Sequence, residues 1–324
     1  MNPTTSQNGA PLSGFSVNPL GTPAEPTSQQ KTGFAKEPIQ NQTPAKPPHL
    51  PPLDQRFVWD IPFACLTKSQ AVERIAQLID RGVPSYVITA NLNYAMLHHQ
   101  QADLRAITEA ADLILADGQP IVWRSRLGNK RLPERVAGSE LIYDLARLAD
   151  QKGWGIYFLG GEPGVAQKCA DNLVRQFPGM RVSGVESPPF RQLTQEESEA
   201  QQNRIRNSGA KILLVAFGQP KGERWIHRHY KEMGIPVSIQ LGASFDFIAG
   251  TAKRAPERWQ RFGAEWVYRM LCDPKRLVPR YWANIRFLAG ALVWDWTDRV
   301  NRWGMGLDSN GQNQPRANRD RSTD

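Results

Sequence analysis

Asp117 is the acidic residue whose place in the sequence most directly suggests chemistry. It follows a short apolar run, Leu113 to Ala116, and precedes Gly118 and a segment with helical spacing, Ile121 to Leu127. A short apolar run closed by glycine is typical of a buried strand. Asp117 is therefore expected where a strand ends and a helix begins, which in open α/β sheets is the edge that binds ligands. Its carboxylate could cap the next helix or act as an acid or base, and position alone favours the cap.

Three further predicted strand ends carry small or polar residues that could contact a substrate. They are Thr89-Ala90-Asn91, Gly160-Gly161 and Gly218-Gln219. Right-handed crossovers would bring these ends to one edge of the sheet, where helix N-termini offer free N–H groups to anions. The run Gly160 to Gly164 could bind a phosphate or could be only a tight turn, because it lacks the Gly-x-Gly-x-x-Gly spacing.

Two basic residues lie close to these predicted strand ends. Lys221 directly precedes a predicted helix, and Arg135 follows Pro133 in a segment with little reason to be buried. Each side chain could bind a phosphate or a carboxylate, or could simply be solvated at the surface. His227 and His229 are two positions apart on a predicted helix and so diverge, which argues against a metal site there.

Strands and helices alternate along most of the chain, and this alternation determines where those residues would lie. Strands are predicted at 85–90, 112–116, 155–159, 181–185, 211–217 and 236–241, and helices at 66–81, 92–109, 139–153, 196–208 and 222–233. Such a pattern predicts an α/β fold with a mainly parallel, Rossmann-like sheet that carries helices on both faces.

The 324 residues divide into four segments by composition. Residues 1–52 are rich in Pro, Gln and Thr and are expected to be disordered, because they carry few large apolar groups. Residues 53–252 form the predicted α/β domain, and 253–303 form a basic, aromatic and helical C-terminal appendage. The polar segment 304–324 is expected to be a disordered tail.

The basic charge of the protein is concentrated in the appendage. The net charge is +9, and Lys253 to Arg302 contains eleven Lys and Arg against five Asp and Glu, together with five of the ten tryptophans. A basic balance suggests phosphate-bearing partners such as nucleic acid, anionic lipid or a nucleotide. The aromatic residues of 280–297 could contact a membrane interface or could pack on the main domain.

Several features concern the cellular compartment. No apolar run follows Met1, so no signal peptide is expected, and no stretch reaches the roughly 18 to 20 apolar residues that span a bilayer. The three cysteines, Cys65, Cys169 and Cys272, are scattered in the sequence. An odd and scattered set argues against a disulfide framework and fits a reducing cytoplasm.

A set of ordered motifs resembles one known family. The blocks are Thr89-Ala90-Asn91, Ala116-Asp117-Gly118, Arg135-Val136-x-Gly138-Ser139, Phe158-Leu159-Gly160-Gly161, Gly218-x-Pro220-Lys221-x-Glu223, Gly242-Ala243-x-Phe245-Asp246, Arg254-Ala255-Pro256 and Glu265-Trp266-x-x-Arg269. Together they resemble the WecG/TagA/CpsF family of bacterial glycosyltransferases over about residues 57–288. Many blocks in one order are far more specific than any single block.

The resemblance implies an inverting and metal-independent transferase without a cofactor. It would move a hexose or N-acetylhexosamine, of the N-acetylmannosamine type, from a UDP-sugar to a sugar on a polyprenyl-diphosphate carrier. Such enzymes serve the assembly of teichoic acid, exopolysaccharide and other cell-surface polymers at the inner membrane face. The protein is therefore expected to be cytoplasmic and peripheral on the inner leaflet, without a nucleic-acid partner, and its oligomeric state is left open.

The resemblance also assigns roles to individual residues. Asp117 matches the general base, and the substrate pocket would include Thr89, Asn91, Arg135, Gln219 and Lys221. The nucleotide and its diphosphate would be bound by Gly160, Gly161, Asp246, Arg269 and Arg276. The family commonly has Pro-Lys-Gln-Glu where this chain has Gly222 in place of the Gln. A pocket hydrogen bond would then be missing or would come from Gln219, which leaves the identity of the sugar open.

Two other functions remain as alternatives. A nucleotide-dependent oxidoreductase on a Rossmann-like domain would need a Gly-x-Gly-x-x-Gly turn followed by an acidic residue about twenty positions later, and this pattern is not found. A non-enzymatic nucleic-acid binder would use the basic C-terminus, and competition between duplex DNA and UDP would distinguish it from the transferase.

Overall fold

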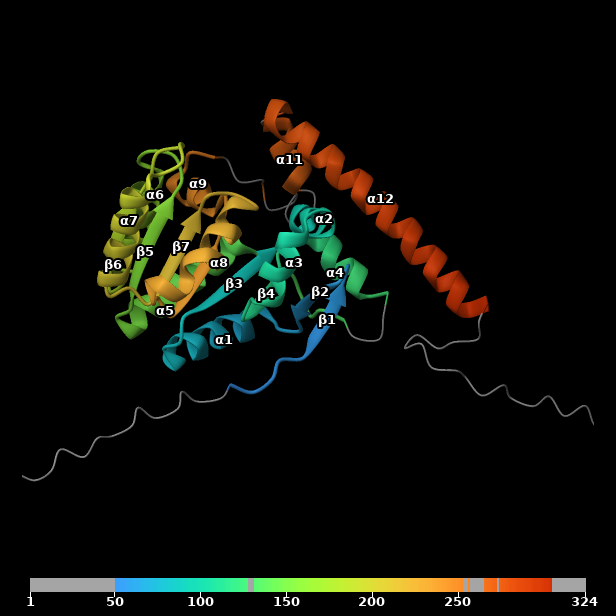
Figure 1. The fold of residues 1–324 in the computed structure, drawn as a ribbon, viewed down its shortest axis with the longest axis horizontal. Coiled ribbons are helices and arrows are strands. Elements are labelled where there is room, and N and C mark those ends of the chain that lie inside the picture. Colours follow the sequence, from blue (N-terminus) through green and yellow to red (C-terminus); the bar gives the residue numbers. More distant parts are fainter. Residues whose placement is uncertain (1–49, 128–130, 253–255, 257–264, 273, 305–324) are drawn as a thin grey trace, which may run out of the picture. The chain divides into compact units, whose positions relative to one another are not determined.

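The computed structural model describes residues 50–127, 131–252, 256, 265–272 and 274–304. Within them, six parallel strands form one sheet in the order β4-β3-β8-β7-β5-β6 (Figure 1). The strands are β3 (Ser85–Ala90), β4 (Leu113–Ala116), β5 (Gly155–Gly160), β6 (Arg181–Glu186), β7 (Ile212–Ala216) and β8 (Val237–Gln240). The predicted mainly parallel sheet is confirmed.

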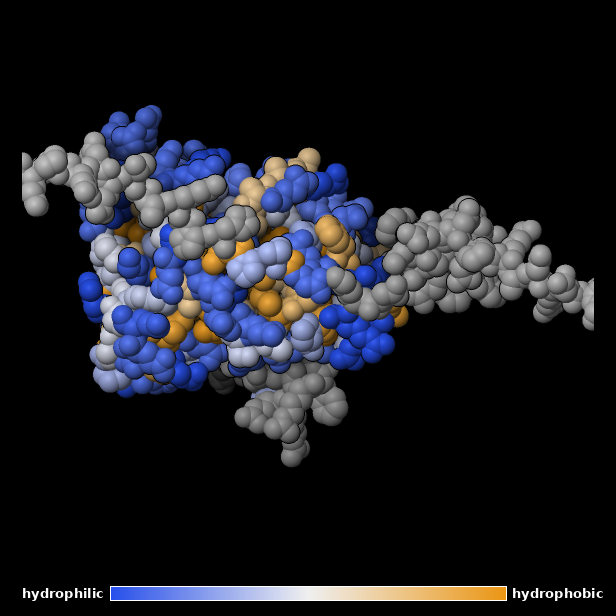
Figure 2. All heavy atoms as spheres, turned by 90° about the horizontal axis from the view of Figure 1, so that it is seen from below, coloured by the Kyte–Doolittle hydropathy of each residue, from blue (hydrophilic) through white to orange (hydrophobic). Residues whose placement is uncertain are grey.

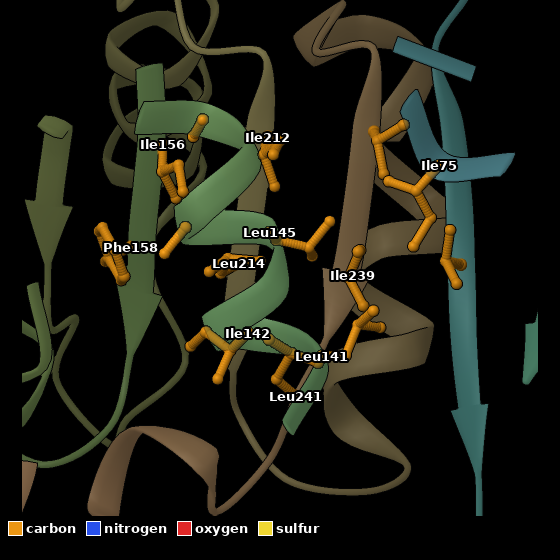
Figure 3. Packing of buried hydrophobic residues seen from close by; sticks show 14 of the residues in the cluster. Ile75, Leu141, Ile142, Leu145, Ile156, Phe158, Ile212, Leu214, Ile239 and Leu241 are labelled. Carbon is orange, nitrogen blue, oxygen red and sulfur yellow. The ribbon is translucent and has the colours of Figure 1, made fainter. Parts of the chain in front are cut away.

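Helices cover both faces of this sheet, as the alternating pattern predicted. One core lies between the sheet and α1 (Lys68–Arg81), α5 (Gly138–Lys152), α6 (Val165–Gln176) and α9 (Ser244–Ala249). The other lies against α2 (Leu92–Gln100), α3 (Ala102–Glu109), α4 (Gln119–Ser125), α7 (Gln195–Asn207) and α8 (Lys221–Met233). Figure 3 shows the first core, where Leu141, Ile142 and Leu145 of α5 lie over side chains of the strands.

The ends of α1 show how local sequence sets a helix boundary. The Thr67 side chain accepts a hydrogen bond from the amide of Gln70, and Oε1 of Gln70 accepts one from the amide of Thr67. This capping box satisfies two N–H groups that the helix itself leaves unpaired. The helix ends at Gly82, whose φ of 70° is a conformation that glycine adopts at little cost.

The segment predicted as one helix over 92–109 is two helices. Gln101 between them is extended, with φ −126° and ψ 111°, and separates α2 from α3. The guanidinium of Arg224, on α8, bonds the side chains of both Gln101 and Asp103 at this break. The prediction of a single helix was wrong because a contact from a distant helix outweighs the local helical spacing.

A hairpin that the sequence reading did not identify precedes α1. Strands β1 (Gln55–Val58) and β2 (Ile61–Ala64) pair antiparallel around a two-residue turn. Trp59 and Asp60 in the turn have φ of 50° and 63°, which suits a two-residue hairpin. The usual glycine or asparagine signal is missing, and the hairpin is held instead by burial of its side chains in the second core.

Two helices form the described part of the appendage, α11 (Glu265–Cys272) and α12 (Pro274–Gly304). The Phe287 ring of α12 packs against Trp59, with ring centroids 5.5 Å apart, and lies 5.9 Å from His99. At least one appendage aromatic residue, Phe287, therefore packs on the α/β domain. The segments predicted to be disordered lie outside the described residues, apart from 50–52 and Gly304, and the division into domains stays a prediction.

The surface in Figure 2 shows apolar residues in several separate patches between hydrophilic ones. Scattered apolar groups are normal on protein surfaces, whereas a row of them along one element indicates an interaction site.

Leu145→Ala should test the packing of α5 on the sheet. Leu145 is fully buried, so the free energy of unfolding should fall by about 2–5 kcal/mol through lost burial and the cavity left behind. Leu292→Ala, at a half-exposed leucine of α12, is the matched control and should change it by less than about 0.5 kcal/mol. Urea unfolding of both variants measures the difference, and equal losses would contradict this account of the core.

Candidate active site

The carboxyl ends of adjacent strands bring the predicted site residues together. Ala90 of β3 is paired with Ala116 of β4, so that Asn91 and Asp117 leave the sheet side by side. The backbone continues this pairing by one step, since the amide of Asp117 donates to the carbonyl of Ala90 at 2.9 Å. The predicted meeting of strand ends at one edge is therefore confirmed for these two strands.

A small space at this edge lies between Thr89 and Asp117. The segment that leads into α5 crosses the edge here, and the amide of Val136 donates to the carbonyl of Ala116 at 2.9 Å. A Cβ atom added to Gly138 would lie 3.4 Å from Thr89 Oγ1 and 3.7 Å from Asp117 Oδ2. The Thr89 hydroxyl and the Asp117 carboxylate thus border the same space, which exists because residue 138 has no side chain.

Asp117 is not the N-cap residue of the following helix. The N-cap of α4 is Gly118, which has an extended backbone and no side chain to contribute. The capping role that position alone favoured is therefore wrong. The Asp117 side chain is half-buried beside Thr89, and its chemical role stays a prediction.

Asn91 has a structural role at the same edge. It is the N-cap of α2, and its side-chain oxygen accepts from the amide of Tyr94 at 3.1 Å. This bond fixes the side chain next to Gly118, where an added Cβ would lie 3.7 Å from Asn91 Cβ. Its contact with a substrate stays a prediction.

Gln219 belongs to a hydrogen-bonded group that reaches α12. Its Oε1 accepts from Nδ2 of Asn93 at 3.3 Å, and its Nε2 donates to the carbonyl of Thr89 at 3.4 Å. Oδ1 of Asn93 in turn accepts from Nε of Arg280 at 3.1 Å. Sequence reasoning missed Asn93 and Arg280, because nothing in their local pattern shows that two distant helices meet here.

The space beside Gly222 is filled by Gln240, the last residue of β8. A Cβ atom at position 222 would lie 2.3 Å from Cδ of Gln240, closer than real atoms approach. With its amide turned to fit its neighbours, Gln240 donates to Val215 and accepts from the amide of Gly218, at 2.8 and 3.0 Å. Gly222 thus leaves room for the side chain of Gln240, which comes from β8. Sequence reasoning did not identify this contact.

Glu223 is another residue that the sequence reading left out of the site. It lies in the first turn of α8, where a solvated side chain is the usual expectation, yet it is 2% exposed. Burial raises the pKa of Glu223 to about 7, while hydrogen bonds from its own amide and from Gln219 and the charges of Arg280 and Arg224 lower it. A carboxyl group that titrates near neutral pH therefore lies next to Gln219.

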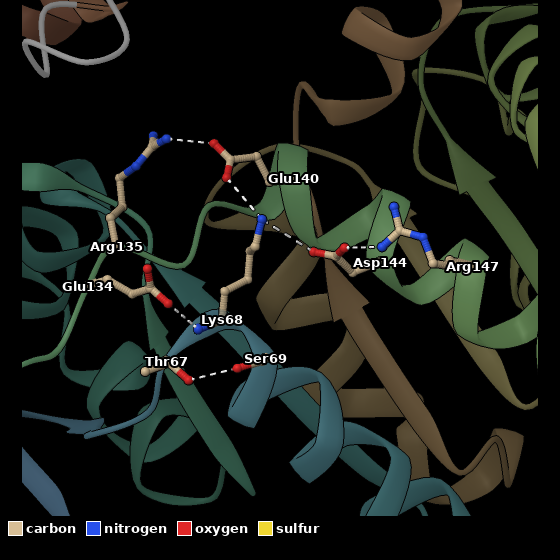
Figure 4. Close-up of polar contacts among 8 residues, drawn as sticks. All are labelled: Thr67, Lys68, Ser69, Glu134, Arg135, Glu140, Asp144 and Arg147. Atoms are coloured by element: carbon tan, nitrogen blue, oxygen red, sulfur yellow. Dashed lines mark hydrogen bonds and ion pairs between the residues drawn. The ribbon is translucent and has the colours of Figure 1, made fainter.

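Arg135 lies at the side of the site within a network of charges (Figure 4). Its Nη2 atom is 2.8 Å from Oε1 of Glu140, and Lys68 lies 3.6 Å from both Glu140 and Asp144. The Glu140 carboxylate thus balances part of the positive charge of Arg135. Its predicted place in the substrate pocket is not tested by these contacts.

The predicted phosphate-binding residues lie near other strand ends. Gly160 and Gly161 have φ of 109° and 72°, and a Cβ at Gly160 would lie 2.9 Å from the carbonyl of Ala216. This close approach explains the glycine at 160 as part of a tight turn. Lys221 is exposed at the start of α8, and Asp246 lies in α9, where its carbonyl accepts from the amide of Thr251 at 3.0 Å.

Arg269 lies in α11 and Arg276 in α12, but their side chains are outside the described part of the structure. Among the described residues, no group of three His, Cys, Asp or Glu side chains is arranged to hold a metal ion. The independence from metal stays a prediction.

Comparison with known proteins gives consistent results. Residues 56–301 match the model of the glycosyl transferase WecG/TagA/CpsF family. A protein of Bacillus spizizenii named N-acetylglucosaminyldiphosphoundecaprenol N-acetyl-beta-D-mannosaminyltransferase is 32% identical over 208 residues, which cover 63% of this chain and 79% of that protein. A protein of Bacillus subtilis with the same name is 29% identical over 208 residues, with the same coverage of both chains.

Gly138→Ala should test whether the space beside Asp117 is used. The new methyl group would lie between the Thr89 hydroxyl and the Asp117 carboxylate and 3.2 Å from Cδ2 of Leu241. We expect kcat/KM to fall at least about tenfold because a substrate atom can no longer enter. The free energy of unfolding should change by less than about 2 kcal/mol. A stable variant with unchanged kinetics would place the reaction elsewhere.

Proposed function

The chain belongs to the WecG/TagA/CpsF family of glycosyltransferases, and we propose that it transfers an N-acetylhexosamine of the N-acetylmannosamine type. The donor would be a UDP-sugar, and the acceptor a sugar linked through a diphosphate to a polyprenyl carrier. The names of the two Bacillus relatives support both the transferred sugar and the lipid-linked acceptor. The product would enter a cell-surface polymer such as teichoic acid or an exopolysaccharide.

One observation carries this proposal most directly, the common space between Thr89 and Asp117. In our proposal the acceptor hydroxyl lies there and the Asp117 carboxylate takes its proton. The alkoxide oxygen then attacks the anomeric carbon from the face opposite the diphosphate, and the bond from that carbon to the diphosphate breaks with inversion. A positioned carboxylate supplies this general-base step, and the UDP leaves with the bonding electrons.

The departing diphosphate requires positive charge or N–H donors. We assign this role to Arg269 and Arg276 of the appendage and to the turn at Gly160 and Gly161, with Asp246 near the nucleotide. Arginine forks and backbone amides can stabilise a diphosphate without a metal ion. We assign the sugar-binding contacts to Thr89, Asn91, Arg135, Gln219 and Lys221.

The outward side of α12 supports a contact with the membrane surface. Val278, Trp282, Ile285 and Leu292 are exposed and recur at helical spacing, whereas Leu277 and Asn284 on another side of the helix are buried. Among the described residues, no helix has the length and hydropathy needed to cross a membrane. We propose that this apolar row lies in the interface of the inner leaflet, where a polyprenyl-linked acceptor would be found.

Measurement of UDP release tests the proposed reaction. The full-length protein is incubated with a panel of UDP-sugars and a polyprenyl-diphosphate-linked N-acetylglucosamine, with and without EDTA. We expect the largest acceptor-dependent release with UDP-N-acetylmannosamine and no loss with EDTA. Release that needs no acceptor, or that occurs only with another sugar, would refute the proposed substrates, and release that requires magnesium or manganese would refute the metal-free mechanism.

Asp117→Asn should separate binding from chemistry. The amide has nearly the same shape but cannot take the acceptor proton, so turnover should fall about a hundredfold or more while affinity for UDP is kept. Single-turnover rates and UDP titration measure the two quantities. A folded variant with unchanged turnover would remove Asp117 from the mechanism.

Trp282→Ser combined with Leu292→Ser should weaken membrane binding. The two replacements remove apolar area from the exposed row of α12, so sedimentation with anionic liposomes should fall several-fold. Phe190→Ser, at an exposed aromatic residue outside α12, is the control and should leave sedimentation unchanged. Equal binding by the double variant and the unmodified protein would exclude this row as the contact.

A further inference from the structure

A buried carboxylate lies beneath the edge of the sheet at Glu223. The residue is 2% exposed, and its Oε2 atom has no hydrogen-bond partner among the described residues. A glutamate in the first turn of a helix normally benefits from the helix N-terminus while remaining solvated. A buried carboxyl oxygen without a partner is costly, so the helix terminus alone does not account for this residue.

Charged and titratable groups from three helices surround Glu223. Arg280 approaches from α12, Tyr94 from α2, and Arg224 from α8 itself. Arg224 is engaged with Asp103 of α3, at 2.6 Å, and the Tyr94 hydroxyl is paired with Thr108, at 2.8 Å. Arg280 is therefore the cation near Glu223 that comes from the appendage.

Gln219 and Asn93 connect this carboxylate to both the site and the appendage. The Gln219 side chain lies close enough to Glu223 to lower its pKa, donates to the carbonyl of Thr89 and accepts from Asn93, which in turn accepts from Arg280. An amide side chain can be held in either of two orientations by its partners. A negative charge at Glu223 favours the orientation in which the Gln219 amide nitrogen faces it and the oxygen faces Asn93.

We propose that Glu223 is a positioning residue for glycosyl transfer: its negative charge orients Gln219 and, through Asn93, holds Arg280 and α12 beside Thr89 and Asp117. The inference rests on the proposed function only for the substrates used in its test. Neutralisation of Glu223 would release Gln219 and loosen α12 at the site without removing any group that touches the substrate.

The titration of Glu223 makes the proposal measurable. Since burial raises its pKa to about 7, the carboxylate is mostly ionised at pH 8.5 and mostly protonated at pH 5.5. Glu223→Gln imitates the protonated state at every pH. The ratio of kcat for the unmodified protein to kcat for this variant should therefore be near one at pH 5.5 and rise to about tenfold at pH 8.5.

Two further variants define the role of the charge. Glu223→Asp keeps the charge and should recover part of the rate at pH 8.5, whereas Glu73→Gln, at an exposed glutamate of α1, should give a ratio near one at every pH. Thermal unfolding at each pH identifies variants that are merely destabilised. A kcat ratio for Glu223→Gln that stays constant across this pH range would overturn the proposal.

A test of coupling does not depend on turnover. Trypsin can cleave α12 at Arg280 and Arg286, and loosening of α12 should speed this cleavage. At pH 8.5 we expect Glu223→Gln and Asn93→Ala to raise the cleavage rate to a similar degree, and the double variant to be no faster than either single one. Independent, additive increases or unchanged cleavage would contradict the proposal. If no UDP-sugar is turned over by the unmodified protein, the proposed substrates fail, while this cleavage assay still decides the role of Glu223.

Discussion

The parallel pairing of β3 with β4 on one side and β8 on the other is the constraint on which the site depends. Because all three strands run in one direction, their carboxyl ends lie at one edge, and the pairing of Ala90 with Ala116 sets the spacing between the residues that follow. The Thr89 hydroxyl also donates to the carbonyl of Gln240 at 3.1 Å, which ties the β8 end to the same edge. A one-residue slip in either pair would turn these side chains to the opposite face.

The space at this edge depends on absent side chains as much as on present ones. Gly138 leaves room between a hydroxyl and a carboxylate, and Gly222 leaves room for the amide of Gln240. In the first case the added Cβ would lie next to the Thr89 hydroxyl and the Asp117 carboxylate, and in the second it would collide with a side chain from a neighbouring strand. Glycine at both positions therefore depends on side chains that other strands contribute.

The appendage and the α/β domain are connected through polar and aromatic contacts of different character. The Phe287 ring lies against Trp59 and near His99, whereas Arg280 is linked through two amide side chains to a carboxylate with a pKa of about 7. An ionised Glu223 costs desolvation energy that a nearby guanidinium and amide only partly offset. A buried carboxylate of this kind is more readily retained where its negative charge aids function than where its side chain only fills space.

The fold class, the family and the strand ends that carry Thr89, Asn91 and Asp117 could be predicted from the amino-acid sequence, because alternation, breakers and ordered motifs are local properties of the chain. That Gly118 rather than Asp117 caps α4, and that Gln101 interrupts a helix, follows from contacts formed on folding. The burial of Glu223 and the fit of Gln240 beside Gly222 are also decided by the tertiary structure. These features depend on contacts between residues far apart in sequence, and a side chain is buried or exposed, charged or neutral, according to the element that packs against it.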